Sequence, residues 1–254
     1  MSEEGYPVPG RPAPLEIKDG ANPEHICCDT SGLLQVFVAD QALVLRSLRD
    51  TYQIQPLVVE AVDSEVRYKL KQKWPDRLSA YTKATRNGLV AVLNADYLAS
   101  CGHAASASGT MMTAINKTGD DFYRRVDRGE AYTHAAANLL EVPTLSEDIN
   151  AVFKLLDAKH KLPRPILRAF DLFMFGLQIG ILDISDCARI RKLLMRCEEF
   201  VPECFAKCSF EDGLPNFYAR LLDADRTRVG SENPRTRFDD RLLVRKKSQP
   251  AAGG

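Results

Sequence analysis

Short apolar runs rich in β-forming residues alternate along this chain with longer segments of helical periodicity. The runs lie at residues 26–28, 57–59, 89–93, 142–145 and 165–167. Most of the intervening segments place apolar residues three or four positions apart, which is typical of amphipathic helices. Strands that alternate with helices are typical of a parallel sheet covered on both faces. The sequence therefore predicts a three-layer α/β/α fold with a central, mostly parallel sheet of four or five strands.

The helical segments follow the same pattern. They are expected at residues 33–48, 62–70, 129–140, 149–158, 170–179 and 185–197, with a short final helix at 217–222. Ser185 is the expected N-cap of its helix. Residues 100–119 are small, polar and contain glycine, so this segment is expected to form a loop or a mobile cover.

The composition of the chain indicates three regions. Residues 1–24 are rich in proline, glycine and charge, which predicts a flexible N-terminal arm. Residues 25–222 contain all the expected strands and helices and should form one domain. Residues 223–254 are polar and rich in arginine, which predicts a disordered tail.

Charge and cysteine content narrow the class of protein. The 34 basic residues equal the 34 acidic residues in number, so binding of phosphate groups must depend on local patches. The seven cysteines are odd in number and irregularly spaced, unlike a disulfide framework. The N-terminus lacks the pattern of a secretory signal, and no segment is apolar enough to span a bilayer. These features predict a cytoplasmic protein without a membrane partner.

Four short motifs place a carboxylate where a strand is expected to give way to a helix. The carboxylates belong to Asp29, Glu65, Glu130 and Asp148. In an open α/β sheet such junctions lie along one edge, where ligands bind. Carboxylates that converge there repel one another unless a divalent cation joins them. The four motifs therefore predict a metal site, of the type that carries out phosphodiester chemistry.

Each motif taken alone has a simpler interpretation. Asp29 could be a helix cap, and Glu65 and Glu130 could be first-turn acids that complement a helix dipole. Only the set of four favours a shared site. Two neighbouring acids compete with Glu65, namely Glu60 and Asp63.

The ordered motifs resemble the PIN domain, a metal-dependent ribonuclease fold. They read Asp-Thr-Ser-Gly-Leu-Leu at 29–34, Ser-Glu-Val-Arg-Tyr at 64–68, Gly-Glu-Ala at 129–131 and Leu-Ser-Glu-Asp at 145–148. The segments 168–173 and 180–182, with the helix from Ser185, resemble the closing part of that family. The resemblance covers about residues 25–200. It departs from the family pattern at residues 100–120 and beyond 222.

The resemblance implies a role for each motif residue. Asp29, Glu65, Glu130 and Asp148 match the acidic quartet that carries catalysis and metal binding, and Ser31 and Ser146 match its supporting hydroxyl groups. Glu65 is preferred for the second position because Val-Arg-Tyr follows it. Glu147 competes for the fourth position, where the Ser-x-Asp spacing favours Asp148.

Hard cations such as Mg²⁺ or Mn²⁺ take oxygen ligands and keep several waters. Asp29 and Asp148 are therefore the expected main ligands, and Glu65 and Glu130 would hold metal-bound waters or a second ion. Ser31 would orient the carboxylates or the scissile phosphate by hydrogen bonding, together with Ser146.

Basic residues just before Glu130 are candidates for contact with RNA. Arg124, Arg125 and Arg128 could contact phosphates near the metal, although a solvated charged surface explains them equally well. His134 lies four residues after Glu130 on the same helical face. It could contact substrate or metal, but a structural role is favoured.

The resemblance implies a Mg²⁺- or Mn²⁺-dependent endoribonuclease, a hydrolase acting on RNA. Such an enzyme could be a toxin held by an antitoxin, or an RNA-processing enzyme, and a homodimer is left open. Two alternatives remain: a non-catalytic PIN-like module that works through protein contacts, and a structure-specific DNA nuclease.

Overall fold

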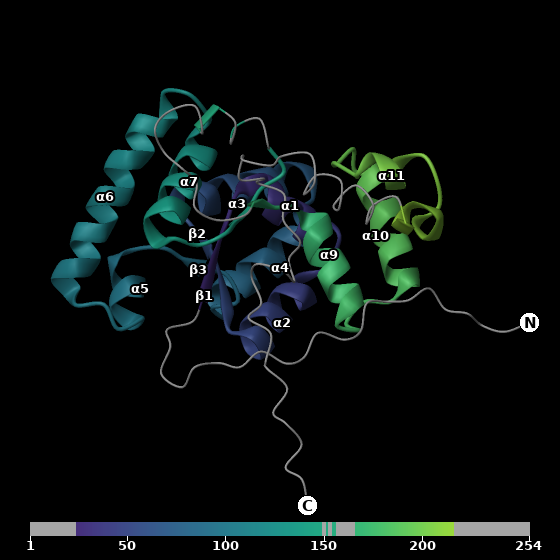
Figure 1. Ribbon diagram of the computed structural model, residues 1–254, viewed down its shortest axis with the longest axis horizontal. Helices are drawn as coiled ribbons and strands as arrows, with labels where there is room; N and C mark the ends of the chain where they lie inside the picture. Colours follow the sequence, from purple (N-terminus) through teal and green to yellow (C-terminus); the bar gives the residue numbers. More distant parts are fainter. Residues whose placement is uncertain (1–23, 149–150, 152–153, 156–165, 216–254) are drawn as a thin grey trace, which may run out of the picture.

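The computed structural model describes residues 24–148, 151, 154–155 and 166–215 (Figure 1). Within them, five parallel strands form one sheet in the order β3-β2-β1-β4-β5. The strands are β1 (Glu24–Cys28), β2 (Ile54–Val58), β3 (Ala91–Val92), β4 (Thr144–Leu145) and β5 (Ile166–Leu167). The predicted α/β fold with a parallel sheet is confirmed.

The order of the strands reverses beside β1. The chain builds outward from β1 to β2 and β3, and then returns to place β4 on the other side of β1. The pairing of Cys28 with Leu145 joins β1 to β4 at the carboxyl ends of both strands. This reversal is a topological switch point, and open α/β sheets bind their ligands in the crevice that such a point creates.

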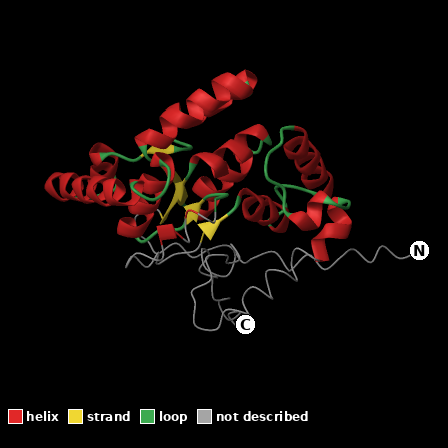
Figure 2. Cartoon of the chain, turned by 90° about the horizontal axis from the view of Figure 1, so that it is seen from above, coloured by secondary structure: helices red, strands yellow, loops and turns green. Residues whose placement is uncertain are grey.

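Helices cover both faces of the sheet, as Figure 2 shows from above. They are α1 (Thr30–Val38), α2 (Ala42–Tyr52), α3 (Glu60–Lys73), α4 (Pro75–Arg86), α5 (Ala95–Ser100), α6 (Ala105–Tyr123), α7 (Arg128–Leu140), α9 (Ala169–Gln178), α10 (Ile184–Arg196) and α11 (Glu203–Ala206). Helix α7 packs against β1 and β4 and carries α6 on its outer side, with α5 against α6 (Figure 1). On the opposite side, α9 contacts both α1 and α2, and α2 packs on β2.

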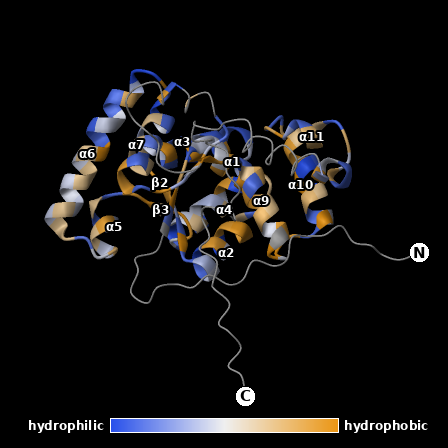
Figure 3. Cartoon of the chain, viewed as in Figure 1, coloured by the Kyte–Doolittle hydropathy of each residue, from blue (hydrophilic) through white to orange (hydrophobic). Residues whose placement is uncertain are grey.

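The core lies between these layers. All five residues of β2 are buried, and Ile26 and Leu57 have no exposed surface. Phe170 and Phe173 of α9 are also buried and belong to the same apolar cluster. Figure 3 shows the strands and α9 mostly in hydrophobic colours, whereas α6 alternates between hydrophilic and hydrophobic residues. Helix α6 is therefore an amphipathic outer helix.

The prediction of a loop at residues 100–119 is wrong, because most of this segment belongs to α6. Its buried residues include Ser108, Ile115 and Phe122, which share one face of the helix. That face packs against α7. The small and polar composition suggested a loop, but alanine favours helix and the buried face supplies the stabilisation.

Two further helical predictions are corrected. Residues 33–48 form not one helix but α1 and α2, because Asp40 adopts a left-handed φ of 61° between them and pairs with Arg77 at 3.0 Å. Helix α10 begins after Asp183 rather than at Ser185. Asp183 Oδ1 accepts a hydrogen bond from the amide of Asp186 at 2.7 Å, and Asp186 accepts one from the amide of Asp183 in return. Helices α4 and α5 were not anticipated.

The second strand is longer than its apolar run. It starts at Ile54 and includes Pro56, a residue that sequence reasoning places outside central strands. Strand β3 pairs only with Leu57 and Val58, so β2 is an open edge at Pro56 on that side. Proline is tolerated at such an edge because no ladder hydrogen bond is needed from its nitrogen there.

Several sequence predictions fall outside the described residues. The C-terminal tail, the helix at 217–222 and the C-terminal boundary of the predicted domain lie there, as do residues 1–23 of the N-terminal arm. The last residue of the predicted arm, Glu24, belongs instead to β1. Of the helix expected at 149–158, only residues 151 and 154–155 are described, and these are helical. Among the described helices, none combines the length and the apolar character needed to cross a membrane.

A pair of glycine substitutions tests the close approach of α1 to β4. A Cβ atom at Gly32 would lie 2.9 Å from the carbonyl oxygen of Leu145, whereas one at Gly109 in α6 would meet nothing. We expect Gly32→Ala to lower the free energy of unfolding by about 1–3 kcal/mol through overpacking. Gly109→Ala should raise it by up to about 1 kcal/mol because alanine favours helix. Urea unfolding measures the free energy of unfolding of both variants, and equal changes in the two would contradict the close packing of α1 on β4.

Candidate acidic site at the switch point

Asp29 lies at the centre of the site, directly after β1. Its Oδ2 atom accepts a hydrogen bond from the Ser31 hydroxyl at 2.8 Å and another from the Ser146 hydroxyl at 3.3 Å. Because Ser146 follows β4, the second bond crosses the switch point. The amide of Asp29 also donates to the carbonyl of Leu145 at 2.8 Å. The carboxylate is therefore fixed from both strands.

The Asp29 side chain is not used as a helix cap. Although Asp29 is the N-cap residue of α1, its carboxylate makes no capping hydrogen bond. The residue is only 3% exposed. Burial raises the pKa of its carboxyl; the Ser31 hydroxyl lowers it in part, and the negative charge of Glu65 raises it further. Such a carboxylate is costly for the fold unless something stabilises its charge.

Glu65 reaches the site from α3. Its Oε2 atom accepts a hydrogen bond from the Thr30 hydroxyl at 2.8 Å, and Lys69 pairs with its Oε1 atom at 2.6 Å. A Cβ atom at Gly129 would lie 2.9 Å from Glu65 Oε2. Only glycine therefore lets the start of α7 approach Glu65 this closely.

The acids that compete with Glu65 occupy other environments. Asp63 accepts hydrogen bonds from Arg67 and from the Tyr81 hydroxyl, both at 2.9 Å. That carboxylate is thus engaged between α3 and α4. Glu60 is exposed at the start of α3. Neither side chain takes the position next to Thr30.

Glu130 and Asp148 form a coupled acid pair. Burial raises the pKa of Glu130 to about 8, assisted by the charges of Asp29 and Asp148 and by a hydrogen bond with Asp148. Asp148 is held in turn by its amide, which donates to Ser146 Oγ at 3.2 Å, and by the amide of Ala151, which donates to Asp148 Oδ1 at 3.1 Å. The protonated form of Glu130 is therefore favoured by its burial and by the neighbouring carboxylates.

Glu147, the competitor of Asp148, has a different role. Its Oε1 atom accepts a hydrogen bond from the amide of Ala169 at 2.7 Å, at the start of α9. Burial raises its pKa to about 7, while the Ala169 amide and Arg168 oppose that shift. A carboxylate at a helix N-terminus stabilises the helix. The role of Glu147 is therefore to stabilise the start of α9.

The three arginines predicted to contact RNA are all exposed. Arg124 and Arg125 are exposed where α6 ends. Arg128 is also exposed, and its guanidinium lies 5.8 Å from the centre of the Tyr132 ring. It neighbours Gly129 and so lies beside the acids.

His134 has no exposed surface, and neither ring nitrogen has a hydrogen-bond partner. Burial lowers its pKa to about 4, although the charge of Asp148 acts in the opposite direction. A side chain without exposed surface cannot contact a substrate in this structure. The complete burial of His134 is therefore compatible with the structural role that the sequence favoured.

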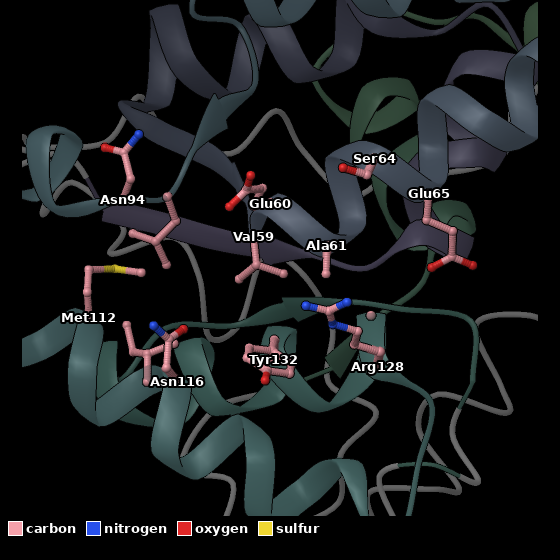
Figure 4. A pocket seen from close by; sticks show the side chains of 13 residues that line it. Val59, Glu60, Ala61, Ser64, Glu65, Asn94, Met112, Asn116, Arg128 and Tyr132 are labelled. Atoms are coloured by element: carbon pink, nitrogen blue, oxygen red, sulfur yellow. The ribbon is translucent and has the colours of Figure 1, made fainter.

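A pocket of about 590 Å³ opens next to the acids (Figure 4). Its lining comes from α3, α6, α7 and the end of β3, and includes Val59, Glu60, Glu65, Leu93, Asn94, Met112, Ile115, Asn116, Arg128, Gly129 and Tyr132. Sequence reasoning did not find Asn94, Asn116 or Tyr132. The position of Tyr132 four residues after Arg128 was an available signal, but Asn116 could not be placed while its helix was taken for a loop.

The four predicted acids have side chains that suit a metal ion, although their arrangement is not yet that of a metal site. In the described part of the chain, no group of three or more His, Cys, Asp or Glu side chains is arranged to hold a metal ion. The chemistry of the donors nevertheless fits a hard divalent cation, since all four offer carboxylate oxygens. The raised pKa of Glu130 also fits, because burial and the charges of Asp29 and Asp148 raise it, and a bound cation would offset that repulsion.

No protein-family model, curated protein or solved structure matches this chain. The class of protein is therefore defined by the fold and the site alone. They define an α/β protein with an acidic cluster at the switch point of a parallel sheet.

The raised pKa of Glu130 predicts how stability depends on pH. Because its folded pKa of about 8 lies above its ordinary value of 4.5, the folded state binds more protons, and stability should fall as pH rises between these values. In Glu130→Gln this loss should be smaller, since the side chain no longer ionises. Urea unfolding in EDTA at several pH values measures it.

Exposed Glu141→Gln is the matched control and should follow the wild type. A Glu130→Gln variant that loses stability as steeply as the wild type would show that Glu130 is not the group responsible.

Proposed function

We propose that this chain is a PIN-like, metal-dependent endoribonuclease that hydrolyses RNA at the switch-point edge of its sheet. The observation that carries the proposal is the position of Asp29. It is buried at the switch point, held by both predicted serines, and electrostatically coupled to Glu65 and to Glu130. The resemblance of the motifs to the PIN domain supplies the reaction class.

The four acids have different roles in this proposal. Mg²⁺ or Mn²⁺ would be held by Asp29 and Asp148, with Glu65 and Glu130 on bound waters or a second ion. The bound cation would neutralise the phosphodiester, activate the attacking water and stabilise the leaving oxygen.

The serines orient these acids. Ser31 and Ser146 hold Oδ2 of Asp29, and Ser146 also accepts the amide of Asp148, so one hydroxyl aligns the two main ligands. Arg128 is exposed beside the acids and would contact the RNA there.

The biological setting belongs to the same proposal. The seven cysteines are all free, which suits a reducing, cytoplasmic compartment. A partner that restrains the enzyme, such as an antitoxin, would have to cover the acidic edge or the pocket beside it.

A non-catalytic module is the second candidate. One observation favours it, namely that no three potential ligands in the described residues already have metal-binding geometry. Metal binding distinguishes the two candidates, because a module that works through protein contacts needs no cation.

Asp29→Asn is the main test. We expect the wild type to cleave single-stranded RNA with Mn²⁺ and not with EDTA, and Asp29→Asn to lose more than about 100-fold in rate, since metal catalysis supplies several kcal/mol. The variant should be as stable as the wild type or more so, because it removes a buried charge. Gel-based cleavage assays and thermal unfolding measure the two effects.

Asp121→Asn is the matched control, because Asp121 is exposed near the end of α6 and does not line the pocket beside the acids. DNA of equal length tests the nuclease alternative. Absence of both Mn²⁺ binding and cleavage in the wild type would reject the enzyme and favour the non-catalytic module.

Ser146→Ala tests the bridge between the two main ligands. Loss of the hydroxyl should weaken Mn²⁺ binding by about 10- to 100-fold, because groups that orient metal ligands have effects of this size. Calorimetric titration measures the affinity, and Ser106→Ala, at an exposed serine in α6, should bind like the wild type. Unchanged affinity in Ser146→Ala would show that this hydroxyl does not align Asp29 and Asp148 for metal binding.

A further inference from the structure

The pocket beside the acids is continuous with the proposed catalytic edge. Glu65 and Gly129 line it, and a Cβ atom at Gly129 would lie 2.9 Å from Glu65 Oε2 and 3.4 Å from Thr30 Oγ1. Figure 4 shows Glu65 and Arg128 at one end of the pocket and Asn94 and Met112 at the other. A ligand bound at the acids could therefore extend one of its groups into this space.

The pocket walls combine apolar surface with a few polar groups. Leu93 and Ile115 are buried and form part of the apolar lining. Asn116 is exposed on α6, so its amide can offer both a donor and an acceptor. Asn94 uses its side-chain oxygen to accept the amide of Tyr97 at 2.8 Å, which leaves its NH₂ group as a donor. Such a lining suits a flat, neutral group with hydrogen-bonding edges.

The Tyr132 ring is held in a fixed orientation at the pocket wall. Its hydroxyl donates a hydrogen bond to Asp120. Its ring lies against Gly119, where a Cβ atom would come within 2.7 Å of Tyr132 Cδ1. Arg128 lies over the same ring, 5.8 Å from its centre. Tyr132 and Arg128 therefore place an ordered aromatic ring and a guanidinium at the same wall of the pocket, and unpaired bases stack on groups of both kinds.

Charge and size limit what the pocket can hold. Glu60 and Glu65 place two carboxylates at its wall, of which Glu65 is paired with Lys69, and Arg128 places one cation there. The wall therefore carries no excess of positive charge that would favour a phosphate, and a neutral base is not repelled. The volume of about 590 Å³ lies in the range of about 300–1,000 Å³ that is typical of small-molecule pockets.

We propose that this pocket binds one unpaired base of the RNA, next to the phosphate held at the acids, by stacking on Arg128 and Tyr132 and by hydrogen bonds to Asn116 and Asn94. The proposal rests on the proposed function, because it names the part of the substrate that lies beside the scissile bond. It makes the enzyme specific for single-stranded or looped RNA, since a base within a duplex is not free to enter. It also gives the cleavage site a preferred base.

Nucleosides test the pocket without requiring catalysis or metal. The wild-type protein is titrated in EDTA with adenosine, guanosine, cytidine and uridine, and with ribose as the control ligand, while NMR follows the ring resonances of Tyr132. We expect at least one nucleoside to shift these resonances and ribose to leave them unchanged. Tyr132→Ala should weaken nucleoside binding by about 5- to 100-fold, the effect of losing one stacking platform. Binding to this variant is followed by calorimetry.

Asn116→Ala provides a second variant, because Asn116 is exposed and its replacement should not disturb folding. It should weaken the preferred nucleoside by about 3- to 10-fold and reduce the preference among bases, since one hydrogen-bonding partner is lost. Asn138→Ala, on α7 but outside the pocket, should bind like the wild type.

The outcomes separate this inference from the proposed function. The inference is overturned if no nucleoside shifts Tyr132, if ribose shifts it equally, or if both pocket variants bind like the wild type. Asp29-dependent RNA cleavage without nucleoside binding would leave the nuclease in place and reject the base pocket. Nucleoside binding that depends on Tyr132, in a protein that cleaves no RNA with Mn²⁺, would support the pocket and reject the nuclease.

Discussion

The burial of the Asp29 carboxylate between the ends of β1 and β4 is the constraint on which the rest of the site depends. A buried carboxylate without partners is strongly unfavourable. Here two serine hydroxyls, one from each side of the switch point, hold the same oxygen atom. Two glycines complete the arrangement, because Gly32 brings α1 onto β4 and Gly129 brings α7 onto α3. The site is thus built by close backbone approach as much as by charge.

Acids that are neighbours in the sequence have contrasting environments. Glu147 turns to the start of α9, while Asp148 turns to Glu130. Asp63 is neutralised by Arg67, which leaves Glu65 to face the cluster. Asp63 and Glu147 thus serve contacts between helices, whereas Glu130 faces the charges of Asp29 and Asp148, which together with burial raise its pKa. This concentration of carboxylates, together with the buried position of Asp29 and the motif order, supports the proposal of a divalent cation.

Sequence patterns predicted the sheet, and placed Asp29 and Asp148 correctly after strands, because strand and helix periodicities differ and parallel strands end at one edge. The junctions predicted for the other two acids are wrong, because Glu65 lies within α3 and Glu130 is in α7, which follows α6 rather than a strand. The roles of paired neighbours such as Glu147 and Asp148 could be ranked only from motif spacing, since the direction of a side chain after a strand depends on tertiary contacts. Helix α6 was missed because its composition is loop-like and its stabilisation comes from α7. The pocket was missed for the same reason, because Asn116 of α6 and Tyr132 of α7 line it together only when these two helices pack.

The bond between Ser146 and Asp29 joins residues 117 positions apart, and this separation affects when the site can exist. Contacts of such long range form late, after the intervening chain has closed into a loop. On a ribosome, β1, α1 and α3 emerge well before β4, so a partly synthesised chain carries Asp29 and Glu65 without Ser146 or Asp148. Assembly of the acidic cluster is therefore coupled to near-complete synthesis of the sheet, and an unfinished chain has no complete site.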